Sequence, residues 1–176
     1  MSKSVKRVAQ AAADLGLEID IKRMGQSTRT AEDAAIGCGC DVAQIVKSLI
    51  FQGRGTGDLI LLLVSGANRV DLAKAAAAVG QPLDRADADV VRARTGFAIG
   101  GVAPIGHLTA PAIWMDRTLI NYAEVWAAAG APDAVFQVAP GTLQKVTGAA
   151  LADLSEETRA SAKDTGFQGK AQTPHP

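Results

Sequence analysis

A lysine stands inside an apolar segment of this chain. Lys47 lies in the run VKSLIF, which extends from Val46 to Phe51. An unpaired ammonium is costly to bury, so a lysine at such a position either meets an acceptor or extends its charged end into solvent. In the first case Lys47 provides a fixed cation for a phosphate, a hydroxyl or another electron-rich group.

A glycine-rich loop follows further along the chain. The segment from Thr95 to His107 reads TGFAIGGVAPIGH and has four glycines and one proline between positions 96 and 106. Glycine allows the backbone to approach a ligand closely and to present its N–H groups. Together with Lys47, such amides can hold a phosphate, a ribose hydroxyl or a developing oxyanion. The alternative is that these glycines form only a tight connection between strands.

The two cysteines give little indication of metal or redox chemistry. Cys38 and Cys40 form an isolated C-x-C pair, and the sequence has only two histidines, His107 and His175. A structural metal site needs about four such ligands, and this spacing is poor for a disulfide. We therefore expect two thiols in a turn, with no metal and no cofactor.

Composition indicates an ordinary globular domain. The chain has 176 residues, of which 48% are hydrophobic and 20% charged, and its 18 basic residues balance its 18 acidic ones. Bulk charge therefore gives no indication of binding to DNA, and contact with any nucleic acid depends on a local patch. The longest apolar run, from Leu59 to Val64, is too short to span a bilayer. With no apolar signal segment after Met1 to Arg7, we expect a cytoplasmic protein without membrane contact.

Hydrophobic periodicity and capping residues predict interleaved helices and strands. Gly16 ends the first amphipathic helix, and Thr30, Asp41, Asp71 and Asp87 are placed as helix N-caps. We expect helices over 5–15, 30–37, 71–79, 87–94, 122–129 and 140–146, a short helix after Asp41, and strands over 17–23, 48–51, 58–65, 113–116 and 134–138. The fold class is therefore α/β, or mixed α+β, with a mixed sheet. We predict one domain over residues 1–155 and a polar, flexible tail over 156–176.

Four stretches together resemble the YbaK-type aminoacyl-tRNA deacylases, which are related to the editing domain of bacterial prolyl-tRNA synthetase. The stretches are RTAEDAA from Arg29, QIVKSLIF from Gln44, the loop from Thr95 to His107, and VAPGTL from Val138. Their order and spacing match the family from about Val5 to Leu154. The lysine segment and the G-G-x-x-P-x-G loop are the specific part of this resemblance.

The resemblance implies a twisted mixed β-sheet flanked by helices and a trans-editing hydrolase. Such an enzyme removes a wrong small amino acid, here alanine, cysteine, serine or threonine, from a tRNA 3′ end. The ester is already activated, so the protein must mainly position it and stabilise the oxyanion as water or the terminal ribose hydroxyl attacks. The resemblance implies no protein nucleophile, and no nucleophile elbow is visible in the sequence.

The residues that match the family's stretches are the candidate site. Lys47, Gly100 and Gly101 are the catalytic candidates, and the substrate-binding candidates are Thr30, Val102, Ala103, Pro104, Gly106 and His107. Thr30 is first an N-cap and secondly a residue facing the pocket. We expect His107 to close the loop rather than to transfer a proton, although histidine is the usual residue for that task.

Two acidic positions leave questions open. Asp116 is either a strand-end carboxylate near the site or the cap of the turn that follows, and the cap is favoured. Some family members have an aspartate where this chain has Val135, and Asp133 cannot be assumed to replace it. This departure concerns which amino acid is removed more than it concerns the reaction.

The expected partner is mischarged tRNA. A zero net charge indicates modest affinity, so a synthetase or an elongation factor is a further expected partner. Two other functions stay open: a non-catalytic module that binds aminoacyl or nucleotide ends, and a general hydrolase of small esters. The lack of a nucleophile elbow argues against the general hydrolase.

Overall fold

Helices and strands alternate along residues 2–25 and 30–157, which are the residues that this computed structural model describes. The helices are α1 (Lys3–Asp14), α2 (Ala31–Cys38), α3 (Leu72–Val79), α4 (Ala88–Thr95) and α5 (Pro140–Thr147), with short 3-10 helices η1 (Val42–Gln44) and η2 (Arg117–Asn121). The strands are β1 (Ile21–Arg23), β2 (Val46–Gly53), β3 (Leu59–Ser65), β4 (Leu83–Arg85), β5 (Ala112–Asp116), β6 (Val125–Ala128), β7 (Ala134–Val138) and β8 (Ala150–Ala152). This arrangement confirms the predicted mixed α+β class.

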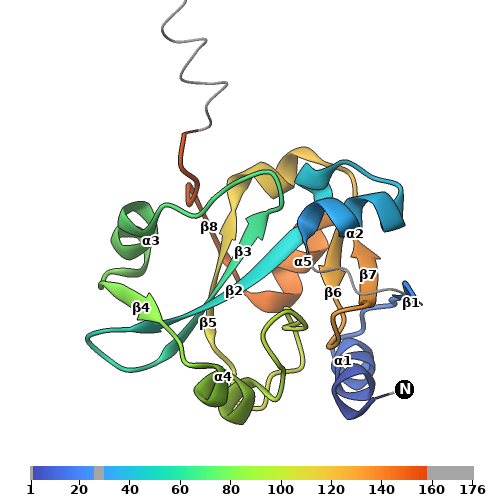
Figure 1. Cartoon of the computed structure of the whole chain (residues 1–176), viewed down its shortest axis with the longest axis horizontal. Helices are drawn as coiled ribbons and strands as arrows, with labels where there is room; N and C mark the ends of the chain where they lie inside the picture. The colour runs from blue at the N-terminus through green and yellow to red at the C-terminus, as the bar shows by residue number, and fades with distance from the viewer. Residues whose placement is uncertain (1, 26–29, 158–176) are drawn as a thin grey trace, which may run out of the picture.

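The strands form two sheets (Figure 1). The larger sheet has the order β4-β2-β3-β5-β8, with antiparallel pairs around β2 and parallel pairs around β5. The smaller sheet, β1-β7-β6, is antiparallel. A parallel bridge between Ile45 and Trp126 joins the two where β2 begins. The mixed sheet expected from the sequence is therefore divided in two, with β2 and β6 side by side at the junction.

Strand β3 is the centre of the larger sheet because both of its faces are apolar. All seven of its residues are buried, in agreement with the uninterrupted run LILLLVS. Leu61 and Leu63 face one hydrophobic cluster with α1 and the smaller sheet, whereas Leu62 and Val64 face a second cluster with α3. A strand covered on both faces is expected to read as a continuous apolar run.

Helix α1 covers part of the smaller sheet with an amphipathic face. Val5, Val8 and Ala12, at helical spacing, are buried in the cluster that also holds Phe136. At 12 residues α1 is the longest helix among those described. Within residues 2–25 and 30–157, every helix lacks the length or the apolar character that crossing a membrane requires.

Polar side chains cap α2 and α3 as the sequence predicts, whereas the predicted cap Asp87 makes no side-chain hydrogen bond at the start of α4. Thr30 Oγ1 accepts the N–H of Asp33 at 3.1 Å, which starts α2. Asp71 Oδ1 accepts the N–H groups of Ala73 and Lys74 at 2.9 and 3.1 Å, which starts α3. Each bond satisfies a donor that has no partner within its own helix.

The helix predicted over Tyr122 to Ala129 is wrong, because residues 125–128 form strand β6. The alanines there favour a helix on intrinsic propensity. Burial nevertheless alternates, with Val125 and Ala127 inside and Trp126 half-buried, and β6 pairs with β7. Tertiary pairing has overridden local propensity, as it commonly does for short segments.

Other boundaries also differ from the prediction. The first strand begins at Ile21, and the short strands β4 and β8 were not predicted. Three residues at a sheet edge carry too little alternation to be recognised. From residue 158 onward, the tail that was predicted to be flexible lies outside the described residues. Arg29 of the first resembling stretch lies outside them as well.

Replacing Leu62 by alanine should lower the free energy of unfolding by about 2–5 kcal/mol, because the side chain is fully buried on β3 and its loss leaves a cavity. Leu72→Ala is the matched control, since Leu72 is 47% exposed. Urea unfolding measures both variants. Similar losses in the two would contradict the central place of β3 in the core.

Candidate active site

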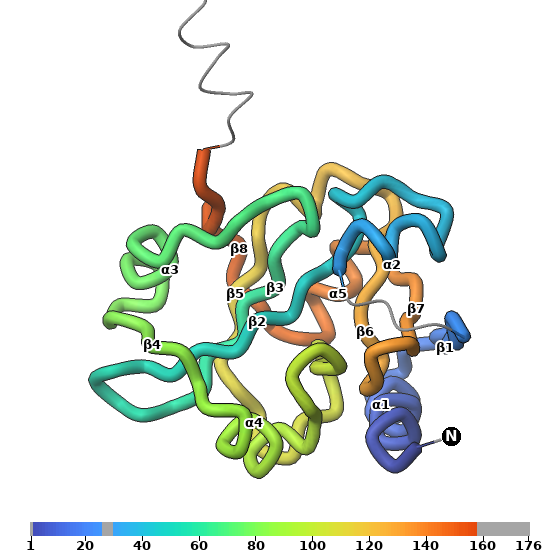
Figure 2. The backbone as a smooth tube through the Cα atoms, viewed as in Figure 1, coloured from blue at the N-terminus to red at the C-terminus, as the bar shows by residue number. Residues whose placement is uncertain are grey.

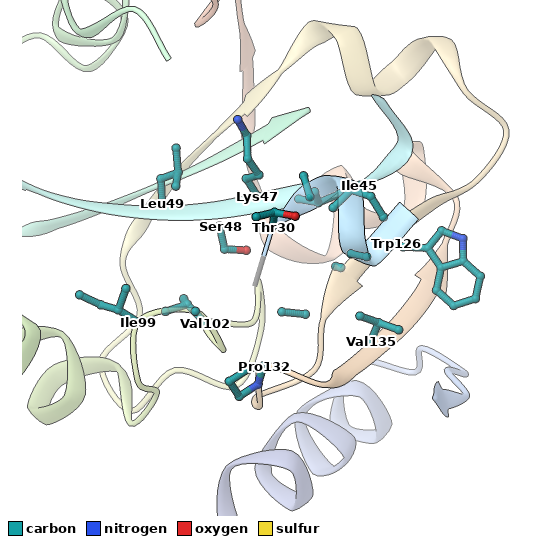
Figure 3. Close-up of a pocket in the computed structure, with 16 residues that line it drawn as sticks. Thr30, Ile45, Lys47, Ser48, Leu49, Ile99, Val102, Trp126, Pro132 and Val135 are labelled. Carbon is teal, nitrogen blue, oxygen red and sulfur yellow. The ribbon is translucent and has the colours of Figure 1, made fainter. Parts of the chain in front are cut away.

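A cavity of roughly 290 Å³ lies between β2, the start of α2, the glycine-rich loop and the smaller sheet (Figure 3). Most of its lining is apolar and small. The lining residues are Thr30, Ala31, Ala34, Ile45, Val46, Lys47, Ser48, Leu49, Ile99, Gly100, Val102, Trp126, Ala127, Ala128, Pro132 and Val135. Such a mainly apolar cavity with few polar groups is typical of a site for a small ligand group.

Lys47 and Ser48 extend to opposite sides of β2, as successive strand residues do (Figure 3). The ammonium of Lys47 donates a hydrogen bond to the backbone carbonyl of Asn68. Burial lowers the pKa of Lys47, while the nearby carboxylates of Glu32 and Asp116 act in the opposite direction. The lysine thus has an acceptor within the protein, as the cost of burying its charge requires.

Asp116 organises the turn that receives Lys47. Its carboxylate is 1% exposed and accepts the N–H of Ser65 at 3.1 Å, the side-chain amide of Asn68 at 2.8 Å and the N–H of Thr118 at 3.0 Å. The bond to Thr118 confirms the predicted cap. The other two bonds place Asp116 beneath the 65–68 turn, so the position of the Asn68 carbonyl depends on this carboxylate.

Ser48 is a site residue that the sequence analysis missed. Its Oγ is buried and makes no hydrogen bond to the residues that the structure describes. It lies on the side of β2 that faces the glycine-rich loop (Figure 3). An unpartnered buried hydroxyl is unfavourable unless a ligand or water satisfies it. The signal for Ser48 was its place next to Lys47 in a strand, which assigns it to the opposite face.

The glycine-rich loop has an exposed tip and a buried base. The N–H of Gly101 donates to the carbonyl of Ala98 at 3.0 Å, and Gly100 has a φ of 97°, as the third position of a type II turn requires. The N–H of Gly101 is therefore already used. Among the described residues, the N–H groups of Gly100 and Val102 have no hydrogen-bond acceptor, so they are free amides on residues that line the cavity.

The structure separates the predicted site residues into two groups. Thr30, Lys47, Gly100 and Val102 line the cavity. The others, which are Gly101, Ala103, Pro104, Gly106 and His107, belong to the same loop but are not among the residues that line the cavity. Ala103 is fully buried in the core, and Gly101 packs against the backbone of Ala131 with no space for a side chain.

His107 contacts two other residues of the glycine-rich loop and stabilises its fold. Its Nε2 donates to the carbonyl of Ala103 at 2.6 Å, and its ring meets the edge of Phe97 with centroids 5.2 Å apart. Its Nδ1 is buried and has no partner among the described residues. Burial lowers the pKa of His107 below its ordinary value, and the charge of Arg7 acts in the same direction. The ring is therefore held neutral and away from the cavity.

The structure also shows where Val135 and Asp133 lie, the two positions considered for the aspartate of some family members. Val135 lines the cavity, whereas Asp133 lies elsewhere and forms an ion pair with Arg23 at 3.1 Å. Asp133 consequently does not replace the aspartate of some relatives, and this part of the cavity is apolar.

Cys38 and Cys40 are free thiols at the end of α2. Burial raises the pKa of Cys38 to about 11, and the neighbouring Cys40 adds to this effect. Both thiols are therefore protonated and poorly nucleophilic near neutral pH. Within the described ranges, no three His, Cys, Asp or Glu side chains are grouped so that they could hold a metal ion.

Sequence comparison finds relatives over most of the chain. The profile of the family described as "Aminoacyl-tRNA editing domain" matches residues 26–146. The chain is 29% identical over 142 residues to "Uncharacterized protein YwhH" of Bacillus subtilis, which covers 81% of this chain and 90% of that protein. It is 25% identical over 127 residues to "Putative Cys-tRNA(Pro)/Cys-tRNA(Cys) deacylase EbsC" of Enterococcus faecalis, covering 72% of this chain and 77% of that protein.

Structural comparison finds similar solved structures over most of the chain. A crystal structure named "a putative trans-editing enzyme for prolyl tRNA synthetase" has a TM-score of 0.84 and 47% identity, covering 89% of this chain and 99% of that one. The hypothetical protein APE2540 has a TM-score of 0.78 and 29% identity, covering 85% of this chain and 99% of that one.

Asp116→Asn should lower the free energy of unfolding by about 1–3 kcal/mol, because an amide cannot accept all three hydrogen bonds at once. Asp133→Asn is the control, since its ion pair with Arg23 is partly exposed and is worth about 0–1 kcal/mol. Urea unfolding compares the two. Equal losses would contradict the special place of Asp116.

His107 should make the protein less stable in acid. Its folded pKa lies below the ordinary 6.5, so the unfolded chain takes up the proton first as the pH falls. Its contribution to stability is therefore lost from about pH 6.5 downward, until the folded pKa is reached. Urea unfolding of the wild type and of His107→Gln above and below this window measures the effect. The prediction fails if both proteins lose the same stability.

Proposed function

The chain belongs to the aminoacyl-tRNA editing domain family, and we propose that it hydrolyses the ester joining a wrongly attached small amino acid to a tRNA 3′ end. The observation that carries this proposal is the cavity itself. Gly100 and Val102, whose N–H groups are free among the described residues, and Ser48, whose hydroxyl has no partner there, line a small apolar space. The names of the similar deacylase and of the similar trans-editing structure support it.

The chemistry requires little from the protein beyond positioning and stabilisation of charge. In our proposal the ester carbonyl accepts the N–H groups of Gly100 and Val102, which stabilise the oxyanion as the tetrahedral intermediate forms. A water molecule attacks the carbonyl carbon, and the adjacent ribose hydroxyl can relay the proton that this water loses. The bond from that carbon to the ribose oxygen then breaks, the departing oxygen takes that proton, and the free amino acid leaves. Gly101, whose N–H is already bonded, contributes by holding the loop against Ala131.

The apolar part of the cavity is the proposed site for the amino-acid side chain. Ala34, Val46, Ala127 and Val135 leave space for a small group and offer no charged partner. Ser48 Oγ can satisfy the α-amine or a substrate hydroxyl. Alanine, cysteine, serine and threonine are the candidates, and a difference of one methylene changes discrimination by about 1–3 kcal/mol.

Lys47 is the proposed contact for the terminal nucleotide. Its ammonium has three donors, of which one is used on the Asn68 carbonyl. The remaining donors can bind a ribose hydroxyl or a phosphate oxygen. Thr30, at the exposed N-terminus of α2 beside the cavity, is a second proposed contact for this end of the substrate.

The proposed partners beyond tRNA follow from charge. With a net charge of zero, the protein has little general attraction for the tRNA backbone. We therefore propose action in the cytoplasm alongside a synthetase or an elongation factor that delivers the mischarged tRNA.

A non-catalytic binding module is the second candidate. The observation that favours it is the absence of a histidine or carboxylate from the described lining of the cavity. Such a site could hold an aminoacyl end without a protein group to activate water. A module of this kind would protect mischarged tRNA, whereas an enzyme would deacylate it.

Deacylation of tRNAs charged with alanine, cysteine, serine, threonine and proline tests the proposal. We expect rapid loss of one or two small amino acids, with kcat/KM reduced at least about 100-fold in Lys47→Ala because the terminal nucleotide loses its cation. Lys74→Ala is the matched control, since Lys74 lies on helix α3, outside the cavity lining, and forms an ion pair with Asp153. Protection of the ester across the whole panel would instead establish the binding module.

A further inference from the structure

The first half of α1 contacts both walls of the cavity without lining it. One wall is the glycine-rich loop between Gly96 and Gly106, and the other is the 129–132 turn after β6. Figure 2 shows α1 close to that turn at the base of the smaller sheet. The helix precedes the residues that the family profile matches. Helix α1 therefore lies outside the residue range on which the family assignment rests.

Arg7 joins the two ends of the glycine-rich loop. Its Nε donates to the carbonyl of Gly106 at 2.8 Å, and its Nη2 donates to the carbonyl of Gly96 at 2.7 Å. The guanidinium also lies over the ring of Phe97, 4.9 Å from its centroid. Only a planar fork of donors can reach both carbonyls at once, so lysine cannot replace this arrangement.

The glycines at both ends are required for this close approach. Gly96 has a φ of 82°, and a Cβ there would lie 2.3 Å from Arg7 Nη2. Gly106 has a φ of 83°, and a Cβ there would lie 3.3 Å from the carbonyl oxygen of Arg7. Helix and loop are therefore in direct contact at both anchor points.

Ser4 holds the second wall in the same way. Its Oγ donates to the carbonyl of Gly130 at 2.7 Å. Gly130 has a φ of 100°, and a Cβ there would lie 2.7 Å from the carbonyl oxygen of Ser4. The two walls also meet each other, because a Cβ on Gly101 would lie 3.0 Å from the Cα of Ala131.

We propose that Arg7 and Ser4 are positioning residues, which fix the free amides of Gly100 and Val102 relative to the wall formed by Ala128 and Pro132. A loop rich in glycine has many accessible conformations. All but one of them must be disfavoured if its N–H groups are to keep a fixed position. The catalytic part of this inference rests on the proposed hydrolysis. The structural part, that α1 sets the geometry of the cavity, stands independently of it.

Three variants separate positioning from general stability. Arg7→Met keeps an apolar stem near Phe97 but removes both donors, and Arg7→Lys keeps the charge but reaches at most one carbonyl. Ser4→Ala releases only the second wall. Lys6→Met is the matched control, since Lys6 is an exposed cation on the same helix.

Amide hydrogen exchange by NMR reports on each wall directly. In Arg7→Met we expect the N–H groups of Gly101 and Leu108, which bond to Ala98 and Thr95, to exchange about tenfold faster. In Ser4→Ala the N–H groups of Ala129 and Ala134 should respond instead. Unchanged exchange at these amides in both variants would overturn the proposal.

Deacylation kinetics give the second readout. For Arg7→Met we expect kcat to fall between about 10-fold and 100-fold with little change in KM, because displacing the amides affects the transition state more than binding. Arg7→Lys should recover part of this loss, and Lys6→Met should lose nothing. Faster loop exchange with an unchanged kcat would overturn the catalytic role. If the wild type itself does not deacylate, the proposed function fails, and the exchange rates alone decide whether α1 fixes the walls.

Discussion

One buried carboxylate joins the elements on which the rest of the site depends. Asp116 stands at the end of β5 and accepts donors from Ser65 at the end of β3 and from Asn68 in the turn that follows. Asn68 in turn presents its carbonyl to Lys47 on β2. A buried carboxylate must be satisfied by donors at fixed positions, so the ends of three neighbouring strands are held in one arrangement. The lysine can therefore be both partly buried and charged.

Strand geometry then divides the chemistry between two sides of β2. Lys47 faces the polar turn, and Ser48 faces the apolar cavity and the glycine-rich loop. Under the proposed function, the polar side takes the terminal nucleotide and the apolar side takes the small amino-acid side chain. The loop and the 129–132 turn complete the cavity, and α1 contacts both through Arg7 and Ser4. The site is thus assembled from segments far apart in the chain, and its precision depends on contacts outside the cavity.

The sequence predicted the parts of this protein whose cause is local. Thr30 and Asp71 were recognised as caps because a short polar side chain before an apolar repeat satisfies a free N–H group. Strand β3 was recognised because few other elements bear an uninterrupted aliphatic run. The helix expected over 122–129 was wrong because only pairing with β7 makes that alanine-rich segment a strand. Lys47 and the loop were found through composition and resemblance, whereas Ser48, whose signal was its place next to Lys47 in the strand, was missed.

By itself, the sequence determined the mixed class, the order of most elements, the family and the two segments that meet at the cavity. These follow from periodicity, turn residues and a specific motif, all of which are properties of neighbouring residues. The tertiary structure alone decided which loop N–H groups are free. The N–H of Gly101 donates to the carbonyl of Ala98, whereas those of Gly100 and Val102 have no acceptor among the described residues. The tertiary structure also decided that Asp116 binds the side chain of Asn68, whose carbonyl accepts a hydrogen bond from Lys47. Asp133 forms its ion pair with Arg23 outside the cavity lining, and α1 donates hydrogen bonds to both walls. Each of these depends on the distance between atoms that are remote in sequence, which no local pattern encodes.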